Sequence, residues 1–433
     1  MHSSATLCHS SPRRHQPGNS SKYTKQHRIN LPASQAEHPL ILETFLWIMS
    51  VIFASEKSAI IDHESWIVQL IRRHKFALHE HEFSEHKRIK FQDLFDLRTP
   101  YMMDAQAEKV ARQLEEDGNF TAEPKRKKKK NELVVQNKEE NEEVKHILQV
   151  FMSLQLRPEF KQNFQFIPKA DDYRNNNQQI RELRKRFTEA SNTVLPQLDQ
   201  HYDGSAFDVT VVNGIKYILP PNVCYVCDNV TAIMSHFSEF KFDLVVMDPP
   251  WQNKYVRRRT HNHGSHHGYD MLTVGEILQF PVGDLLNDGA LLMIWCTNNS
   301  SLLQELLQGL SGWNVELAAT WYWLKVTKAG ELITPLEGVT HSKRPYERIL
   351  LTRKIKHKMV FQNIPDGLVF CSVPCGIHSH KPPLQELVKE YVVQQPRCLE
   401  LFARSLAPGW TSYGFEVLRL QHSFLYENSE QDG

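Results

Sequence analysis

The feature that most constrains the fold is an uninterrupted apolar run, Leu244–Met247, which leads directly into Asp-Pro-Pro-Trp at residues 248–251. A strand without a polar position is covered on both faces, as in a parallel sheet flanked by helices. Strand-like runs alternate with helix-like segments from about residue 205 onward, which indicates an α/β domain. Ligands of such sheets bind just beyond the carboxyl ends of the strands, so the acidic motif is predicted to lie at a binding site.

Apolar periodicity also predicts the individual elements. Asn213-Gly214 between two alternating runs predicts a hairpin. We expect strands at 223–227, 242–247, 290–296, 313–318, 321–326, 348–352, 368–373 and 399–402, and helices at 60–71, 142–157, 177–190, 229–238, 274–280, 299–310 and 383–393. The helix at 177–190 has a basic face, for which nucleic-acid contact and simple solvation are both open.

Composition narrows the class of protein. A chain of 433 residues with 41% hydrophobic and 23% charged residues is long enough for two or three globular domains. The net charge of +1 means that any affinity for nucleic acid must come from local basic patches. Seven cysteines at irregular spacing favour a reducing compartment over a disulfide framework, and no apolar stretch is long enough to predict a membrane span.

The motif at 248–251 suits one kind of chemistry. Two prolines make the loop stiff, so that it holds a carboxylate, a free carbonyl group and an aromatic ring in fixed positions. The exocyclic amino group of a base is a poor nucleophile because its lone pair is delocalised into the ring. Acceptors for its two N–H bonds localise that pair and stabilise the positive charge that develops on nitrogen. The motif therefore predicts methyl transfer from S-adenosylmethionine to a base; the structural alternative is a turn with Trp251 in the core.

Several further segments, together with this motif, resemble the adenine-N-6 methyltransferases of the mRNA adenosine methyltransferase seventy-kilodalton-subunit family. The resemblance covers about half the chain, in family order. The segments that carry it are Met247–Lys254, Lys343–Glu347, Ser372–Pro374, His378–Pro383, Leu399–Arg404 and Pro408–Ser412. It implies a Rossmann-like, permuted S-adenosylmethionine-dependent methyltransferase domain.

The resemblance also implies roles for individual residues. Asp248 and the carbonyl group of Pro249 would hold the target amino group, and Trp251 would form part of the pocket wall. The implied catalytic residues are Asp248, Pro249, Pro250 and Trp251. The implied cofactor-binding residues are Asp228, Asn229, Asp248, Lys381, Phe402, Arg404 and Glu416. The predicted substrate-binding residues are Trp251, Lys254, Tyr269, Trp295, Trp323 and Lys325.

One position departs from the family pattern. Phe415 stands between Gly414 and Glu416 where the family usually has an asparagine whose amide bonds the cofactor ribose. Losing one hydrogen bond costs about 0.5–1.5 kcal/mol, so we expect cofactor binding to be weakened but not abolished. A polar insertion at 257–267 follows the acidic motif. It could be a lid or a phosphate clamp, or it could be a simple surface insertion.

No metal centre is predicted. Cys224 and Cys227 have the spacing of zinc ligands, but they alternate within a predicted strand and no second pair follows. Cys371, Cys375, His378 and His380 could also supply ligands, but the resemblance assigns their loop to cofactor and substrate. Buried core cysteines are the favoured interpretation of the first pair.

We divide the chain into a disordered leader or extension at 1–48, a mixed, mainly helical region at 49–200 with a basic linker at 123–132, a methyltransferase domain at 201–425 and a disordered tail at 426–433. The run Pro124–Lys130 predicts nuclear import, with the cytoplasm as a second location; a phosphate-binding patch and a solvated linker are its alternatives.

The predicted function is methylation of the 6-amino group of adenine in RNA, small nuclear RNA included, or in DNA. The first alternative is a catalytically inactive partner that binds nucleic acid beside an active methyltransferase; the second is a methylase of another amine. An intact acidic motif and Lys381 favour activity, whereas Phe415 favours the inactive partner. The expected partner is nucleic acid, no contact with a membrane is expected, and the sequence leaves any protein partner unidentified.

Overall fold

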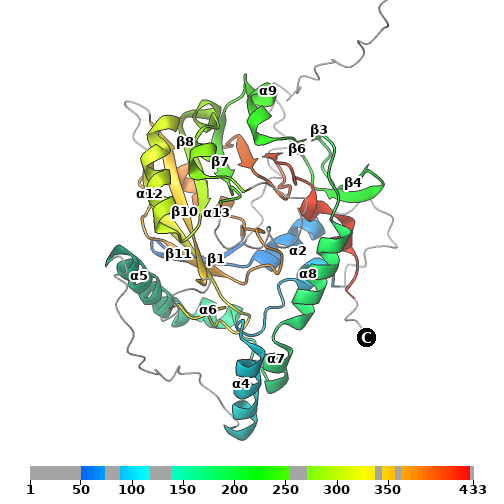
Figure 1. Ribbon diagram of the computed structural model, residues 1–433, viewed down its shortest axis with the longest axis vertical. Coiled ribbons are helices and arrows are strands. Elements are labelled where there is room, and N and C mark those ends of the chain that lie inside the picture. The colour runs from blue at the N-terminus through cyan, green and yellow to red at the C-terminus, as the bar shows by residue number, and fades with distance from the viewer. Residues whose placement is uncertain are drawn as a thin grey trace, which may run out of the picture.

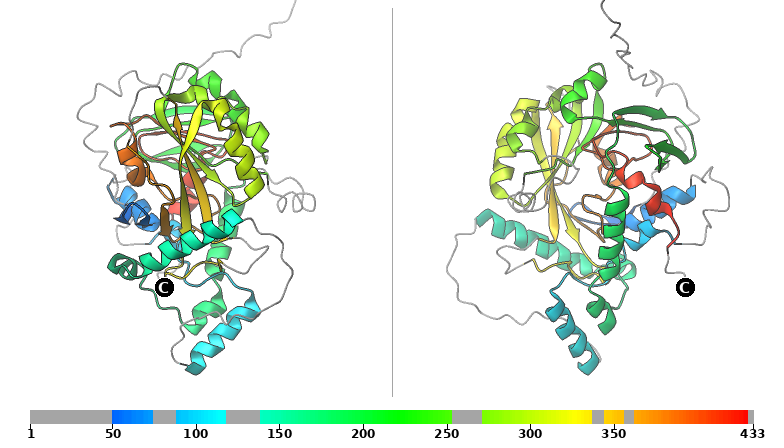
Figure 2. Two further views of the ribbon diagram at one scale, coloured as in Figure 1. Left: turned by 90° about the vertical axis from the view of Figure 1, so that its left-hand side faces the viewer. Right: turned by 45° about the vertical axis from the view of Figure 1, so that its right-hand side comes forward.

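The computed structural model describes residues 50–73, 88–117, 138–252, 271–336, 344–355 and 362–429 (Figure 1). The leader at 1–48, the linker at 123–132 and the insertion at 257–267, together with Lys254 and Tyr269, lie outside these ranges. Most of the described strands form one mixed sheet, and helices pack on both of its faces (Figures 1 and 2). The predicted α/β class is confirmed, and no described helix is long and apolar enough to span a bilayer.

The large sheet has the order β1-β2-β11-β9-β10-β8-β7-β12-β13-β6-β3. Its strands are β1 (Val51–Ala54), β2 (Ser58–Ile61), β3 (Leu198–Tyr202), β6 (Val223–Cys227), β7 (Phe242–Met247), β8 (Leu286–Cys296), β9 (Val315–Lys325), β10 (Tyr346–Lys354), β11 (Val369–Ser372), β12 (Cys398–Leu401) and β13 (Trp410–Tyr413). A separate hairpin, as the Asn213-Gly214 pair predicts, joins β4 (Asp208–Val212) to β5 (Ile215–Leu219). Both turn residues have positive φ, 52° and 78°, as a tight two-residue hairpin turn requires.

Strand direction decides which residues share an edge. Strands β7, β8, β12, β13 and β6 run parallel to one another through successive neighbours. β10 is antiparallel to both β8 and β9, so β9 runs in the same direction as β7, and β11 and β2 are parallel to β9. The carboxyl ends of eight strands and the first residues of β10 therefore lie at one edge of the sheet.

Buried apolar side chains fill both faces of the sheet. On one face β7, β8 and β12 pack against α9 (Ile233–Phe237), α11 (Val274–Leu278) and α12 (Ser300–Gly309). On the other face the alternate side chains of β7, β8, β9 and β10 pack against α13 (Gln385–Val388). Leu244 and Val245, neighbours in β7, belong to opposite faces and are both fully buried. The uninterrupted apolar run thus lies in the middle of the layers, as predicted.

The N-terminal region contributes to the sheet as well as to the helices. Its helices are α2 (His63–Arg73), α3 (Lys90–Asp93), α4 (Asp104–Asp117), α5 (Lys138–Gln155), α6 (Pro158–Asn163), α7 (Ala170–Asn175) and α8 (Gln178–Ala190). α5 and α6 cover β9 and β11, while α2, α3 and α8 pack with the C-terminal segment (Figure 2). β1 and β2 add two strands to one edge of the sheet, and β3 spans the predicted boundary at 200/201.

Three predicted elements need correction. Ile60 and Ile61 end strand β2, and the helix expected from residue 60 begins at His63. The strands expected at 313–318 and 321–326 are one strand, β9, because β10 pairs with its whole length. The packed chain also extends beyond 425: Tyr426 is buried, and the Ser429 hydroxyl donates to Asp93.

Candidate active site

The Asp-Pro-Pro-Trp loop is held rigidly at the carboxyl end of β7. Pro249 and Pro250 are buried, and the Leu272 amide donates to the Pro250 carbonyl at 2.9 Å. The Trp251 indole donates to the Trp295 carbonyl at 2.8 Å, which ties the loop to the end of β8. Trp251 is 7% exposed and packs in the core on the α11 side of the sheet. Its ring therefore holds the loop against the core on the α11 side, and it does not form the wall of the cavity that Asp248 lines.

Asp248 lies between two cations that come from different segments. Its two carboxylate oxygens lie 3.4 Å from Lys381 Nζ and 3.4 Å from Arg404 Nη1. Arg404 follows β12 and also contacts Glu416 at 3.1 Å. β7, β12 and β13 are neighbours and run parallel, so residues 248, 404 and 416 meet although they are far apart in the sequence. The structure thus brings together four of the residues predicted from the motifs.

A second acidic residue completes this charge network. Glu347, the second residue of β10, accepts from both Lys381 and Lys325. Burial alone would raise the pKa of Glu347, but the two ammonium groups outweigh it and hold the pKa well below its usual range. Burial likewise opposes the charge of Lys381, while Asp248 and Glu347 raise its pKa. Lys381 is consequently a buried cation that two carboxylates stabilise.

Aromatic rings surround these charges. Trp295 and Trp323, near the ends of β8 and β9, pack edge to face with ring centroids 5.7 Å apart. Lys381 Nζ lies 4.8 Å from the centre of the Trp295 ring, and Lys325 Nζ lies 4.5 Å from that of Trp323. The Trp323 indole donates to the Ser372 hydroxyl at 2.8 Å. The predicted pair of tryptophans therefore lies beside the predicted lysines.

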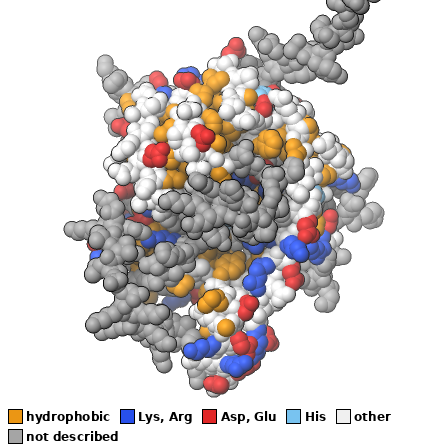
Figure 3. All heavy atoms as spheres, in the orientation of Figure 1, with side chains coloured by type: hydrophobic (Ala, Val, Ile, Leu, Met, Phe, Trp, Pro, Cys, Tyr) orange, Lys and Arg blue, Asp and Glu red, His pale blue; other side chains and the backbone are white. Residues whose placement is uncertain are grey.

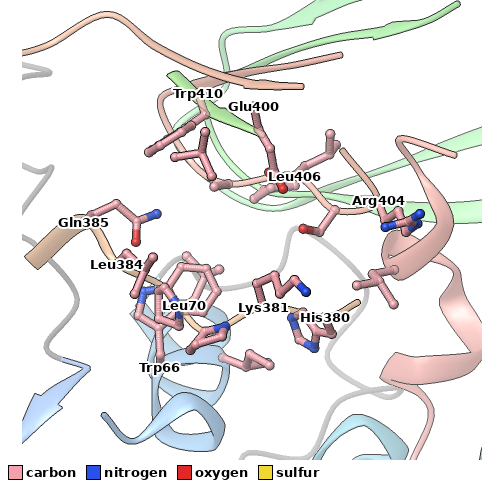
Figure 4. Close-up of a pocket in the computed structure, with 18 of the residues that line it drawn as sticks. Trp66, Leu70, His380, Lys381, Leu384, Gln385, Glu400, Arg404, Leu406 and Trp410 are labelled. Atoms are coloured by element: carbon pink, nitrogen blue, oxygen red, sulfur yellow. The ribbon is translucent and has the colours of Figure 1, made fainter. Parts of the chain in front are cut away.

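A cavity opens beside Asp248, between the strand ends and α2 (Figure 4). Asp248, Trp295, Lys381, Phe402 and Arg404 all line it. Apolar walls come from α2 and from Leu384 and Leu406, so the charged groups face a largely apolar space. Such a cavity, with a few convergent polar groups, is typical of small-molecule sites.

Glu400 also faces this cavity, although no motif predicted a role for it (Figure 4). Burial, together with the nearby Asp248 charge, raises the pKa of Glu400 to about 8, although Arg404 lowers it. Two carboxylates in one cavity therefore differ in their environments. The signal that could have identified Glu400 is an acidic residue inside an otherwise apolar strand, Leu399–Leu401. Glu347 could have been identified because it lies in one of the motifs, Lys343–Glu347.

Two residues at the cavity adopt left-handed backbone conformations. Phe402 has φ 59° and Ser379 has φ 66°. Among the residues that the structure describes, the other non-glycine residues with positive φ are five asparagines, which tolerate this region, and Gln395. A bulky residue such as phenylalanine is strained there by about 1–3 kcal/mol, and such strain persists where the surroundings impose it, commonly at ligand sites.

Asp228 and Asn229 lie at the same edge, after β6, but do not line this cavity. The Asp228 carboxylate contacts Gln197 at 2.7 Å and His236 at 2.9 Å. The Asn229 carbonyl accepts from the Tyr413 hydroxyl at 2.7 Å. The end of β6 is thus fixed against β13, and its residues face a different part of the edge from Lys381.

Phe415 lies between these two parts of the edge. It follows β13, its side chain is 37% exposed, and its carbonyl accepts from the Cys227 thiol at 3.3 Å.

The cysteines considered as metal ligands are mostly buried: Cys224 and Cys227 both lie in β6, and burial raises the pKa of Cys375 to about 12. Within the described ranges no three histidine, cysteine or acidic side chains are grouped as a metal would require.

The architecture and the site together define an α/β domain of the methyltransferase type, with an acidic loop and two cations at one edge of the sheet. Residues 242–416 match the MT-A70 family model. This part of the chain is therefore similar to the MT-A70 family, in agreement with the resemblance that the motifs indicated.

Several named proteins are similar to about half of this chain. It is 39% identical over 224 residues to the human N(6)-adenine-specific methyltransferase METTL4, covering 49% of this chain and 46% of METTL4. It is 35% identical over 217 residues to a DNA N6-methyl methyltransferase of Caenorhabditis elegans, covering 49% and 56%. It is 32% identical over 217 residues to the N6-methyladenosine RNA methyltransferase MTA1 of Pyricularia oryzae, covering 48% and 55%. The match thus spans about half of each relative, and the predicted resemblance to adenine-N-6 methyltransferases is confirmed.

Proposed function

We propose that this protein is an S-adenosylmethionine-dependent methyltransferase that acts on the 6-amino group of adenine in nucleic acid. One observation carries the proposal: the Asp248 carboxylate lies at the rim of a sheet, between Lys381 and Arg404, in a cavity lined by Trp295. The names of the three relatives support adenine N6 as the common target.

The side chains at the cavity fit the proposed cofactor. S-adenosylmethionine has an α-amino group, an α-carboxylate and a positively charged sulfur. Lys381 and Arg404 offer cations for the carboxylate, and Asp248 and Glu400 offer oxygens for the amino group. Phe402 adds an apolar wall, while Asp228, Asn229 and Glu416 lie at the same edge for the nucleoside part. When bound, the cofactor supplies an electrophilic methyl group that leaves its electron pair on sulfur.

The protein's own groups mainly position the partners. Asp248 accepts one N–H bond of the adenine amino group, and the Pro249 carbonyl has a second lone pair for the other. Both acceptors are preorganised, so they stabilise positive charge on nitrogen without rearranging. The nitrogen loses one proton to water once the carbon–nitrogen bond has formed. Holding the partners in line supplies much of the acceleration.

The inactive-partner alternative receives less support from the structure. A protein that has lost its activity has no need to keep a carboxylate between two buried cations, because such groups are costly to desolvate. Lys381 and Arg404 are each 14–16% exposed as side chains, and both contact Asp248. Phe415 remains the one departure from the family pattern, at the position where the family's asparagine bonds the cofactor ribose.

The test is transfer of a labelled methyl group onto matched single-stranded and duplex oligonucleotides of RNA and DNA. The target base must be unpaired or flipped, because its amino group is not accessible inside a duplex. We expect N6-methyladenine as the product, with single strands reacting faster, and the RNA and DNA arms identify the substrate. Label on cytosine or on protein, or no label although the cofactor binds, would contradict the proposal.

We also propose that the protein enters the nucleus, on the strength of the basic run at 124–130. A fluorescent fusion of the full chain is expected to accumulate in the nucleus. Replacing Lys127–Lys130 by alanine is expected to shift it to the cytoplasm, and unchanged nuclear signal in that variant would contradict the assignment.

A further inference from the structure

The α8 helix presents a row of cations to solvent. Arg184 and Lys185 lie three and four residues after Arg181, and all three are exposed, so they lie on the same side of the helix. Arg181 and Arg184 have no acidic partner within the described part of the chain, and Lys185 has only a 4.0 Å contact with Glu189. Lysine and arginine side chains gather where α8 lies (Figure 3). The opposite face of α8 is buried through Ile180 and Phe187.

This basic face begins beside the loop that carries Lys381. The Gly376 amide donates to the Leu94 carbonyl at 2.7 Å. A Cβ atom on Gly376 would lie 2.3 Å from Ile180 Cγ2, so the loop and the first turn of α8 are in direct contact. Five residues separate Gly376 from Lys381, which limits the distance along the loop to about 18 Å. His378 lies between them in the loop and is exposed.

An exposed aromatic ring lies at the same junction. The amide groups of Asn176 and Asn177 donate to the carbonyls of Met102 and Thr99, both at 2.9 Å. These two bonds fix the chain on either side of Tyr101 against the start of α8. Tyr101 is 39% exposed, so its ring is open to solvent beside the start of α8.

We propose that Tyr101, Arg181, Arg184 and Lys185 bind the single strand that carries the target base, on the flank that leaves the active site past His378. Single strands are held by cations along their phosphates and by aromatic rings that stack on their bases, and this surface offers both. It is continuous with the cavity through the 374–381 loop. The inference rests on the proposed function for its substrate, and it adds where the flanking nucleotides lie.

The experiment measures binding of fluorescent 15-nucleotide RNA and DNA single strands, each with a central adenine, to the full-length protein without cofactor. The test variant is Arg181→Glu/Arg184→Glu. The matched control is Lys241→Glu/Arg397→Glu, which changes the charge equally at exposed positions just before β7 and β12, at the opposite edge of the sheet. Circular dichroism and affinity for S-adenosylmethionine report whether each variant is folded.

We expect the test variant to bind the 15-mers at least tenfold more weakly, and the slope of log affinity against log salt to fall by about 1.4, since two phosphate contacts are lost. Binding of an adenine trinucleotide is expected to change little, because it does not reach α8. Tyr101→Ala is expected to weaken binding of the 15-mers at least about fivefold through lost stacking. The control variant is expected to behave as wild type.

Two results would overturn the inference. One is a test variant that binds the 15-mers as tightly and with the same salt slope as the control; the other is displacement of the 15-mers from α8 by an acidic polypeptide at equal charge. Failure of the proposed function is a separate outcome. If strands bind through α8 but receive no methyl group, the binding surface is supported and the proposed methyltransferase activity is contradicted.

Discussion

At the scale of single residues, the site depends on buried charges that stabilise one another. Asp248 contacts two cations, Lys381 contacts two carboxylates, and Arg404 connects Asp248 to Glu416. None of these groups is fully solvated, so each would be costly to bury alone. The network therefore fixes Asp248 without saturating it, because both of its cation contacts are as long as 3.4 Å.

Phe415→Asn is predicted to tighten cofactor binding. The Phe415 side chain is 37% exposed at the end of β13, so an amide at that position can reach a ligand along the same edge. One added hydrogen bond corresponds to about two- to tenfold in affinity. Calorimetry with S-adenosylmethionine measures this. An affinity that is unchanged or weaker would show that the ribose does not lie beside this residue.

Motifs identified the charged residues that stand beside buried strands or inside recognisable segments. Asp248 follows a buried strand, and Lys381 and Arg404 belong to recognisable segments. Glu400 was missed because its role depends on which face of β12 meets the cavity, which one sequence does not reveal. Trp251 packs in the core on the α11 side, and the sequence could not show this because a proline-rich turn leaves the direction of the next ring open.

At the scale of elements, strand direction explains the site. Eight strands end at one edge, and β10, which is antiparallel to its neighbours β8 and β9, brings Glu347 to that edge by its first residues. Continuous apolar runs made β6 and β7 predictable to the residue. β1 and β2 are four residues each, too short for a period of two to stand out, and Ile60 and Ile61 also suited the helix that follows.

Gly376→Ala is predicted to disturb the contact between α8 and the Lys381 loop. Its Cβ would lie 2.3 Å from Ile180 Cγ2, an atom of a buried, stiff β-branched side chain. We expect a loss of about 1–3 kcal/mol in the free energy of unfolding and weaker cofactor binding, because the loop must move.

The matched control for that change is the double variant Gly376→Ala/Ile180→Ala, with Ile180→Ala alone beside it. Removing the Ile180 methyl groups makes room for the new Cβ, so cofactor affinity is expected to recover although stability does not. Denaturant unfolding and calorimetry measure the two effects. Wild-type stability and affinity in Gly376→Ala would contradict the tight contact.

At the scale of the whole molecule, the N-terminal region and the MT-A70-like segment at 242–416 share one core. β2 pairs with β11, and Glu386 of α13 accepts from the backbone amides of Ser50 and Val51. Helix periodicity predicted α5 and α8 well, but it could not show that short strands before them extend the sheet. Such pairing joins residues more than 300 positions apart, and local pattern carries no information about it.

Acid is predicted to destabilise this shared core through two histidines. His63 of α2 and His380 of the Lys381 loop are buried with ring centroids 4.4 Å apart, and neither ring nitrogen of His63 has a partner among the described residues. Burial lowers the pKa of His380 to about 3; burial, and then the proximity of His380, lower that of His63. The unfolded chain binds these protons near pH 6.5, so the free energy of unfolding falls as the pH drops from about 6.5 toward 3.

His63→Leu isolates this effect, because it removes one of the two groups and leaves an apolar side chain of similar size. Between pH 6.5 and 4, the wild-type unfolding free energy is expected to fall more steeply than that of the variant, by up to about 1.4 kcal/mol per pH unit. Urea unfolding at a series of pH values measures both slopes. Parallel slopes would mean that His63 is protonated in the folded protein as it is in the unfolded chain.

The most direct test of the central claim is single-turnover methyl transfer by Asp248→Asn, with cofactor affinity measured on the same sample. The variant keeps the shape of the side chain but loses the charge that stabilises positive nitrogen. We expect the rate of transfer to adenine to fall by about 10²–10³ while cofactor affinity changes by less than about tenfold. Transfer at the wild-type rate with cofactor still bound would contradict the account.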